Sequence, residues 1–178
     1  MKNFLLLFCF FVGFSAIQAQ EQYNVSKGFG AGFAAGYLSE IDAVGGSVDL
    51  IYQLNEKWSI ANTNLFTVSK LPSKERLKWF SMDINARYNV YDKIYMLAGG
   101  QFLYETFIEK VLVGGFVSGE QAIKSSNFGA NIGAGYVYHL LNNANIFVEV
   151  KYTILAEESE PIKSSGYMQA RIGMVFDL

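Results

Sequence analysis

Apolar and polar residues alternate with a period of two along most of the chain from Lys27 onward. The clearest segment is 79–91, whose even-numbered positions carry Phe80, Met82, Ile84, Ala86, Tyr88 and Val90. The odd-numbered positions between them carry Ser81, Asp83, Asn85, Arg87 and Asn89. A helix would scatter both sets around its surface, whereas a β-strand places them on opposite faces. The pattern therefore predicts a strand with one apolar and one polar face.

Further segments with the same alternation bring the expected total to eight strands: 27–38, 43–54, 58–69, 94–107, 127–140, 145–155 and 166–178. The segment 58–69 is the weakest of them, because Asn62 and Asn64 interrupt its apolar face. A β-bulge inserts one residue into a strand and shifts the side chains that follow. We therefore expect a bulge near these two asparagines.

The connections between the expected strands alternate between short and long. Tight turns are expected at 55–57, 91–93 and 141–144, which are rich in turn-forming residues. Between them come 39–42, 70–76, 108–124 and 156–165, of which all but the first are long. Short turns on one rim and longer loops on the other are typical of transmembrane β-barrels, whose short turns lie in the periplasm.

Alternation alone fits a transmembrane barrel, and it also fits a soluble, lipocalin-like periplasmic barrel that binds a small apolar ligand. The interior of an eight-stranded barrel is just wide enough for side chains to fill it. Packing the bulky apolar set inside, with Phe29, Phe33, Phe80 and Phe128 among its members, would overfill that space. The opposite face is rich in glycine, serine and asparagine and fits. Aromatic residues also gather near both ends of the apolar faces, as at the two interfaces of a bilayer. These observations favour lipid on the apolar face.

The predicted inward face carries charges of both signs. Its acids are Asp49, Asp83, Glu105 and Glu149. Its bases are Arg87, Lys151 and Arg171. Isolated buried charges are very costly, so these groups must pair with one another or with water. We expect a polar network in the lumen, which would also obstruct a pore.

The first residues resemble a secretory signal, with Lys2 followed by an apolar run at 4–14 and small residues up to Ala19. We expect residues 1–19 to be a cleaved signal peptide, 20–26 a short N-terminal segment and 27–178 one barrel domain. Cys9, the only cysteine, would be removed with the signal peptide. The mature protein would then contain no cysteine, which excludes disulfides and cysteine-based metal sites. The remaining 13 basic and 16 acidic residues give a net charge of −3, so nucleic acid is not an expected partner.

Composition narrows the class of protein further. Residues are 51% hydrophobic, 16% aromatic and only 17% charged, and there are two prolines. The longest uncharged stretch of the mature chain, 125–148, contains five asparagines and does not resemble a transmembrane helix. If the protein lies in a membrane, a closed barrel is the remaining structure, because lipid cannot satisfy an open backbone edge.

With these strands, the chain resembles the small outer-membrane β-barrel proteins of the eight-stranded OmpA/OmpX-like type over its whole mature region. The last strand, Tyr167 to Leu178, resembles the closing strand of that family, with Phe176 two residues before the end in place of a terminal aromatic. The resemblance implies an all-β, eight-stranded antiparallel up-and-down transmembrane β-barrel in the cell outer membrane. It also implies recognition by the barrel-insertion machinery. Members of the family include adhesins, structural anchors, small pores and a few lipid-modifying enzymes.

Residues of the expected long-loop rim suggest surface contacts. Four bases, Lys70, Lys74, Arg76 and Lys78, are a possible contact with the phosphates of lipopolysaccharide. The connection 108–124 is unusually apolar and either extends its strands as a hairpin or folds inward as a plug. An exposed hairpin edge can recruit a surface protein by strand addition.

The sequence carries no catalytic, cofactor or metal motif that we interpret as functional. His139, the only histidine, is expected beside the short turn at Leu141, on the periplasmic rim and away from outer-leaflet lipid. We expect an integral outer-membrane protein, not an enzyme, with a structural or adhesin-like surface-interaction role. The alternatives are the soluble ligand-binding barrel and a small pore.

Overall fold

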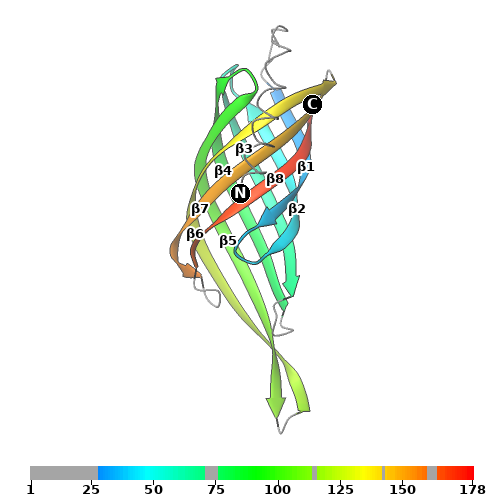
Figure 1. Cartoon of the computed structure of the whole chain (residues 1–178), viewed down its shortest axis with the longest axis vertical. Helices are drawn as coiled ribbons and strands as arrows, with labels where there is room; N and C mark the ends of the chain where they lie inside the picture. Colours follow the sequence, from blue (N-terminus) through cyan, green and yellow to red (C-terminus); the bar gives the residue numbers. More distant parts are fainter. Residues whose placement is uncertain (1–27, 71–75, 114–115, 142, 160–163) are drawn as a thin grey trace, which may run out of the picture.

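The computed structural model describes residues 28–70, 76–113, 116–141, 143–159 and 164–178. The strands found there are β1 (Gly28–Leu38), β2 (Ala43–Gln53), β3 (Trp58–Lys70), β4 (Arg76–Tyr91), β5 (Ile94–Val113), β6 (Phe116–Leu141), β7 (Ala144–Ser159) and β8 (Ser164–Asp177). Each pairs antiparallel with its neighbours in sequence, and β8 pairs with β1 to close the barrel (Figure 1). The predicted eight-stranded antiparallel up-and-down barrel is confirmed.

Closure rests on a continuous ladder between the first and last strands. It runs from Gly30 opposite Asp177 to Leu38 opposite Gln169. A closed ladder leaves no unpaired sheet edge around the wall, which is the condition for a β-structure to lie in lipid. Within the described ranges, no helix is long and apolar enough to span a membrane.

The strands on the long-loop side run further than the sequence predicted. β5 and β6 continue as a paired hairpin as far as Val113 opposite Phe116. In Figure 1 this hairpin projects beyond the other strands at one end of the barrel. Of the two alternatives for 108–124, the structure therefore has the extended hairpin. β4 begins at Arg76 and β7 reaches Ser159, so parts of two other expected loops are also strand.

The expected bulge in 58–69 is wrong. β3 pairs with β4 without interruption from Trp58 opposite Tyr88 to Lys70 opposite Arg76. The inward side chains Ala61, Thr63 and Leu65 are fully buried and keep the alternation in phase. Asn62 and Asn64 therefore stay on the outward face of the barrel.

Apolar side chains fill the loop-side half of the bore. A buried cluster there includes Leu38, Leu65, Leu77, Trp79, Leu103 and Tyr167. The Trp79 and Tyr167 rings meet edge to face with their centroids 5.1 Å apart. A smaller cluster of Ala34, Phe147 and Val175 lies toward the short-turn side. The sequence analysis did not assign these aromatic residues to the interior.

Candidate functional site

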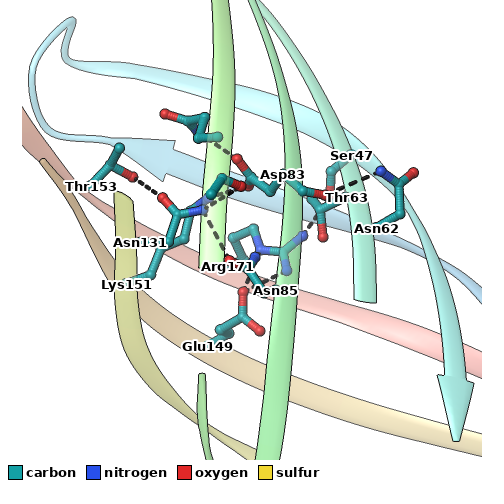
Figure 2. Close-up of polar contacts among 12 residues, drawn as sticks. Ser47, Asn62, Thr63, Asp83, Asn85, Asn131, Glu149, Lys151, Thr153 and Arg171 are labelled. Carbon is teal, nitrogen blue, oxygen red and sulfur yellow. Dashed lines mark hydrogen bonds and ion pairs between the residues drawn. The ribbon is translucent and has the colours of Figure 1, made fainter. Parts of the chain in front are cut away.

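Glu149 on β7 is the centre of a buried polar cluster in the bore (Figure 2). Its Oε2 accepts hydrogen bonds from Arg87 Nη2 and from the Tyr95 hydroxyl, both at 2.8 Å. Its Oε1 accepts from Arg171 Nη2 at 2.5 Å and from Arg171 Nε at 3.1 Å. Glu149 is 1% exposed. One carboxylate thus holds two guanidinium groups from opposite walls of the barrel.

Arg171 on β8 extends the cluster toward β2. Its Nη1 donates to Asp49 Oδ1 at 2.8 Å and to Ser47 Oγ at 3.1 Å. The Thr63 hydroxyl on β3 donates to the same Asp49 carboxylate. Arg171 therefore bridges Glu149 on β7 and Asp49 on β2, two strands that are not neighbours in the barrel.

A second ion pair joins β4 to β7. Lys151 Nζ contacts the Asp83 carboxylate, which also accepts from Gln101 Nε2 at 2.6 Å. The Tyr167 hydroxyl donates to Gln101 Oε1 at 2.6 Å. Beside this pair, three neutral side chains are linked to one another by hydrogen bonds. Thr153 donates to Asn131 at 2.7 Å, and Asn131 donates to Asn85 at 3.0 Å.

The sequence predicted seven charged residues for the lumen, and the structure joins six of them in ion pairs: Asp49, Asp83, Arg87, Glu149, Lys151 and Arg171. Glu105 is also buried, further along β5 toward the hairpin. The neutral partners Tyr95, Gln101 and Asn131 were not included in the predicted network, which was limited to charged residues. Their odd-numbered positions share the phase of the charged residues on the same strands, which is the signal that would have found them.

The short-turn end of the bore is open as a cavity of about 490 Å³. Arg87, Tyr95 and Phe147 are among its lining residues. His139 also lines it, with Nδ1 and Asn145 Oδ1 2.5 Å apart, so the histidine lies on the short-turn rim as expected. The ion-pair cluster and the apolar cluster separate this cavity from the hairpin end. In the described part of the chain, no group of three or more metal-binding side chains is placed to hold an ion.

Three of the four basic residues predicted for the other rim, Lys70, Arg76 and Lys78, lie on strands. Arg76 and Lys78 are exposed at the start of β4, on its outward face. Arg76 Nη2 lies 3.5 Å from Glu120 Oε1 on β6. Lys70 ends β3, and Lys74 falls outside the described residues. The register adds a base that the sequence analysis did not include, because Lys78 pairs with Thr106, which pairs with Lys124.

The outer wall has the opposite character from the bore. Phe33 is 59% exposed and Ile132 56%, whereas Asp49 is 0% exposed. Large apolar residues are exposed on every strand, while the charged side chains of the middle of the barrel point inward. Such a wall is stable against acyl chains and not against water. This chain is a transmembrane β-barrel. The soluble, ligand-binding alternative is therefore wrong.

Comparisons with known proteins agree with this barrel fold. No protein-family model matches the chain, and no curated protein matches it in sequence. A major outer membrane protein from Thermus thermophilus matches in structure with a TM-score of 0.71 at 11% identity, covering 86% of this chain and 100% of that one. The N-terminal β-barrel domain of Pseudomonas aeruginosa OprF gives 0.58 at 14% identity, covering 86% and 98%. Ail, the attachment invasion locus protein of Yersinia pestis, gives 0.55 at 15% identity, covering 86% and 100%. The expected resemblance to small outer-membrane barrels is confirmed at the level of the fold.

Proposed function

We propose that this protein is a closed anchor in the outer membrane that presents the β5–β6 hairpin to a partner protein. The observation that carries the proposal is the unpaired backbone of that hairpin. Among the described residues, β5 pairs with β4 only as far as Ile108 opposite Arg76, and β6 pairs with β7 only from Gly129 onward. The β5–β6 ladder itself continues to Val113 opposite Phe116.

Asn127 marks the point where β6 leaves the barrel wall. Its side-chain amide donates to the backbone carbonyl of Glu157 at 2.6 Å, and the Glu157 N–H donates back to Asn127 Oδ1 at 3.4 Å. The side chain thus substitutes for one step of the β6–β7 ladder. Beyond it, within the described residues, β6 has β5 as its only ladder partner.

The direction of the free backbone groups follows from one hydrogen bond. The Val137 N–H donates to the carbonyl of Lys93, so odd-numbered residues of β6 face β5. The β5–β6 register is continuous from there to Gly119, and successive residues of a strand face opposite sides. Ala122 and Lys124 therefore direct their N–H and C=O groups away from β5. An extended segment of a partner protein can pair with this edge and add a strand.

Side chains fill the bore, and this favours the role of a membrane anchor over that of a pore. Leu65, Leu77 and Leu103 are each 0% exposed in the hairpin-side half. Below them, the Arg87–Glu149 and Lys151–Asp83 ion pairs cross the lumen between β4 and β7. Opening a path for ions would require these buried pairs to separate, and a buried charge that loses its partner is strongly destabilising.

Substituting Ala122→Pro tests the strand-addition edge. Proline has no N–H and is tolerated only at an unpaired edge, so it should block an added strand and leave the β5 ladder intact. The measurement is adherence of bacteria displaying the full chain to fibronectin-coated, collagen-coated and bare surfaces. We expect adherence that depends on the protein, with binding about tenfold weaker for A122P, because the lost N–H hydrogen bond of about 1 kcal/mol and the clash of the proline ring with the incoming strand together reach the roughly 1.4 kcal/mol of a tenfold change.

The matched control is Ala122→Val, which changes the side chain and keeps the backbone donor. It should adhere like the unaltered protein. Equal adherence of the valine and proline variants would contradict strand addition. Adherence no higher than that of cells lacking the protein on both coated surfaces would also count against the proposal.

We also propose that the basic outer rim contacts lipopolysaccharide phosphates. Lys78 and Lys124 occupy one outward row with Thr106 between them, next to the row of Phe80 and Tyr104. Charged groups beside an aromatic belt lie at the depth of lipid headgroups. Arg76 is in the adjacent row, and its contact with Glu120 is half exposed and leaves it accessible.

Replacing both Lys78 and Lys124 with glutamine should reduce co-purified lipopolysaccharide by about tenfold. Each lost charge–phosphate contact removes on the order of 1 kcal/mol near a membrane surface. Lipopolysaccharide is quantified per mole of folded barrel after detergent extraction. Lys57→Gln with Lys93→Gln, at the short-turn rim, is the matched pair. An unchanged lipid content in the first pair, or an equal loss in both, would refute the contact.

A further inference from the structure

Two asparagines lie on the lipid-facing wall. Asn62 and Asn64 are outward residues of β3, partly exposed, and the residues between and beside them point into the bore. Among the described residues, the other outward positions between the two aromatic belts are apolar or glycine. A polar group facing acyl chains is costly unless another group satisfies it.

The hydrogen bonds of these two side chains do not use their full capacity. Asn64 Nδ2 donates to Asn62 Oδ1 at 2.7 Å, and Asn62 Nδ2 donates to the backbone carbonyl of Asp83 at 3.1 Å (Figure 2 shows the Asn62 contact). A primary amide has two N–H donors and a carbonyl with two lone pairs. These bonds leave the Asn64 carbonyl and its second N–H available at the surface of the wall.

Two outward glycines lie near the asparagines, beyond the larger exposed side chains of Val48 and Ile84 that pair with them directly. Gly46 on β2 is outward and adjacent to the row of Asn64, and a Cβ there would meet nothing within 4 Å. Gly100 on β5 lies in the row of Asn62, two strands away, and a Cβ there would meet only Gly129 O at 3.8 Å. Small residues on a membrane-facing surface allow a second polypeptide to pack closely and reach polar groups.

We propose that this patch, made of Gly46, Asn62, Asn64 and Gly100, is the contact between two copies of the barrel in the membrane. The amide is its own complement, since each Asn64 offers one donor and one acceptor. Across a two-fold axis, two Asn64 side chains form two reciprocal N–H to O=C hydrogen bonds. A two-fold contact brings the same surface of both copies together, as this chemistry requires. The patch is separate from the β5–β6 hairpin. The dimer proposed here therefore does not depend on the partner protein proposed for the hairpin edge.

Cross-linking in native outer membranes tests the dimer with both asparagines intact. Val48 is outward on β2, 56% exposed and paired with Asn64, so V48C places a thiol beside the patch. The full chain also carries Cys9→Ser to remove its natural cysteine. The matched control is V150C, which is outward and 45% exposed on β7, four strands away from the asparagines on β3. A thiol-specific cross-linker should give a product of twice the chain mass with V48C and none with V150C.

Adding Asn64→Leu to the V48C chain should reduce the cross-linked dimer by roughly tenfold, as expected for the loss of two weak hydrogen bonds in a membrane. Heat-modifiable gel mobility reports that the barrel is folded, and Asn62→Leu provides a second variant if N64L does not fold. Equal cross-linking at both thiols would overturn the proposal. So would a dimer insensitive to the asparagine substitutions, or a V48C product whose mass identifies a different protein.

Discussion

Replacing Glu149 with glutamine is expected to lower the free energy of unfolding by about 3–5 kcal/mol, the usual cost of removing one partner from a buried ion pair. Glu149 accepts hydrogen bonds from Arg87, Arg171 and Tyr95. Glutamine has nearly the same shape, but half of its acceptor oxygens become an NH₂ group that faces these donors. Arg87 then loses the carboxylate of its ion pair, and Arg171 keeps only Asp49.

Urea unfolding in detergent micelles, followed by tryptophan fluorescence, measures this loss. Trp79 is buried in the bore and Trp58 is exposed on the outer wall, so the signal covers both environments. Glu157→Gln, at an exposed position on the same strand, is the control and should change stability by less than about 0.5 kcal/mol. If E149Q unfolds at the same urea concentration as E157Q, the bore is hydrated enough to solvate two unpaired guanidinium groups, and the cluster does not hold the barrel together.

The strands of the barrel wall were predictable because two different environments act on them. Lipid on one side and a narrow bore on the other select opposite residue types at successive positions, as Met82 and Asp83 illustrate. The hairpin beyond Ile108 has no such pair of environments, so its alternation is weak and its strands resemble a loop in sequence. The ends of β5, β6 and β7 were therefore the least predictable part of the fold.

The sequence was sufficient to predict which charged residues face the bore, but not which of them form ion pairs with one another. Strand phase assigns Glu149 and Arg87 to the interior, but their contact joins residues 62 positions apart. Such contacts depend on the stagger with which the barrel closes, and no single strand contains that information. The alternation also assigns Trp79 and Tyr167 to the bore. The small volume of the bore, however, led to the prediction that its interior residues are small. Glycines on neighbouring strands leave space for other rings in the bore, as Gly135 does for Tyr95 and Gly173 does for Phe147.

Asn62 and Asn64 illustrate a different kind of error. The expected bulge assumed that polar side chains leave a lipid-facing surface. The phase of β3 is instead fixed by Thr63 and Leu65, which fit the bore, and the asparagines remain outside as a consequence. Strand pattern alone does not distinguish a polar residue that stays on the wall from a break in the strand.

Substituting Gly99→Val is expected to destabilise the barrel by an amount at or above the upper end of the roughly 1–3 kcal/mol typical of overpacking. A Cβ at Gly99 would collide with the carbonyl oxygen of Ile84 and lie 2.7 Å from Asn85 Cα, both backbone atoms of the paired strand. Backbone atoms cannot rotate away, so β4 and β5 would have to separate. The displaced Asn85 would also lose its hydrogen bond from Asn131.

Gly46→Val provides the comparison, because it makes the same chemical change on the outward face, where a Cβ meets nothing within 4 Å. Valine is favoured in strands, so the micelle-solubilised G46V barrel should be as stable as the unaltered chain or slightly more stable. Urea midpoints and heat-modifiable mobility of the two variants decide the matter. If G99V and G46V unfold alike, the close approach of β4 and β5 at Gly99 does not limit the packing of the bore. If only G99V is destabilised, the spacing between strands requires small residues on the inward face. Residue size on the outward face is then not limited by that spacing, and large residues there can contact lipid.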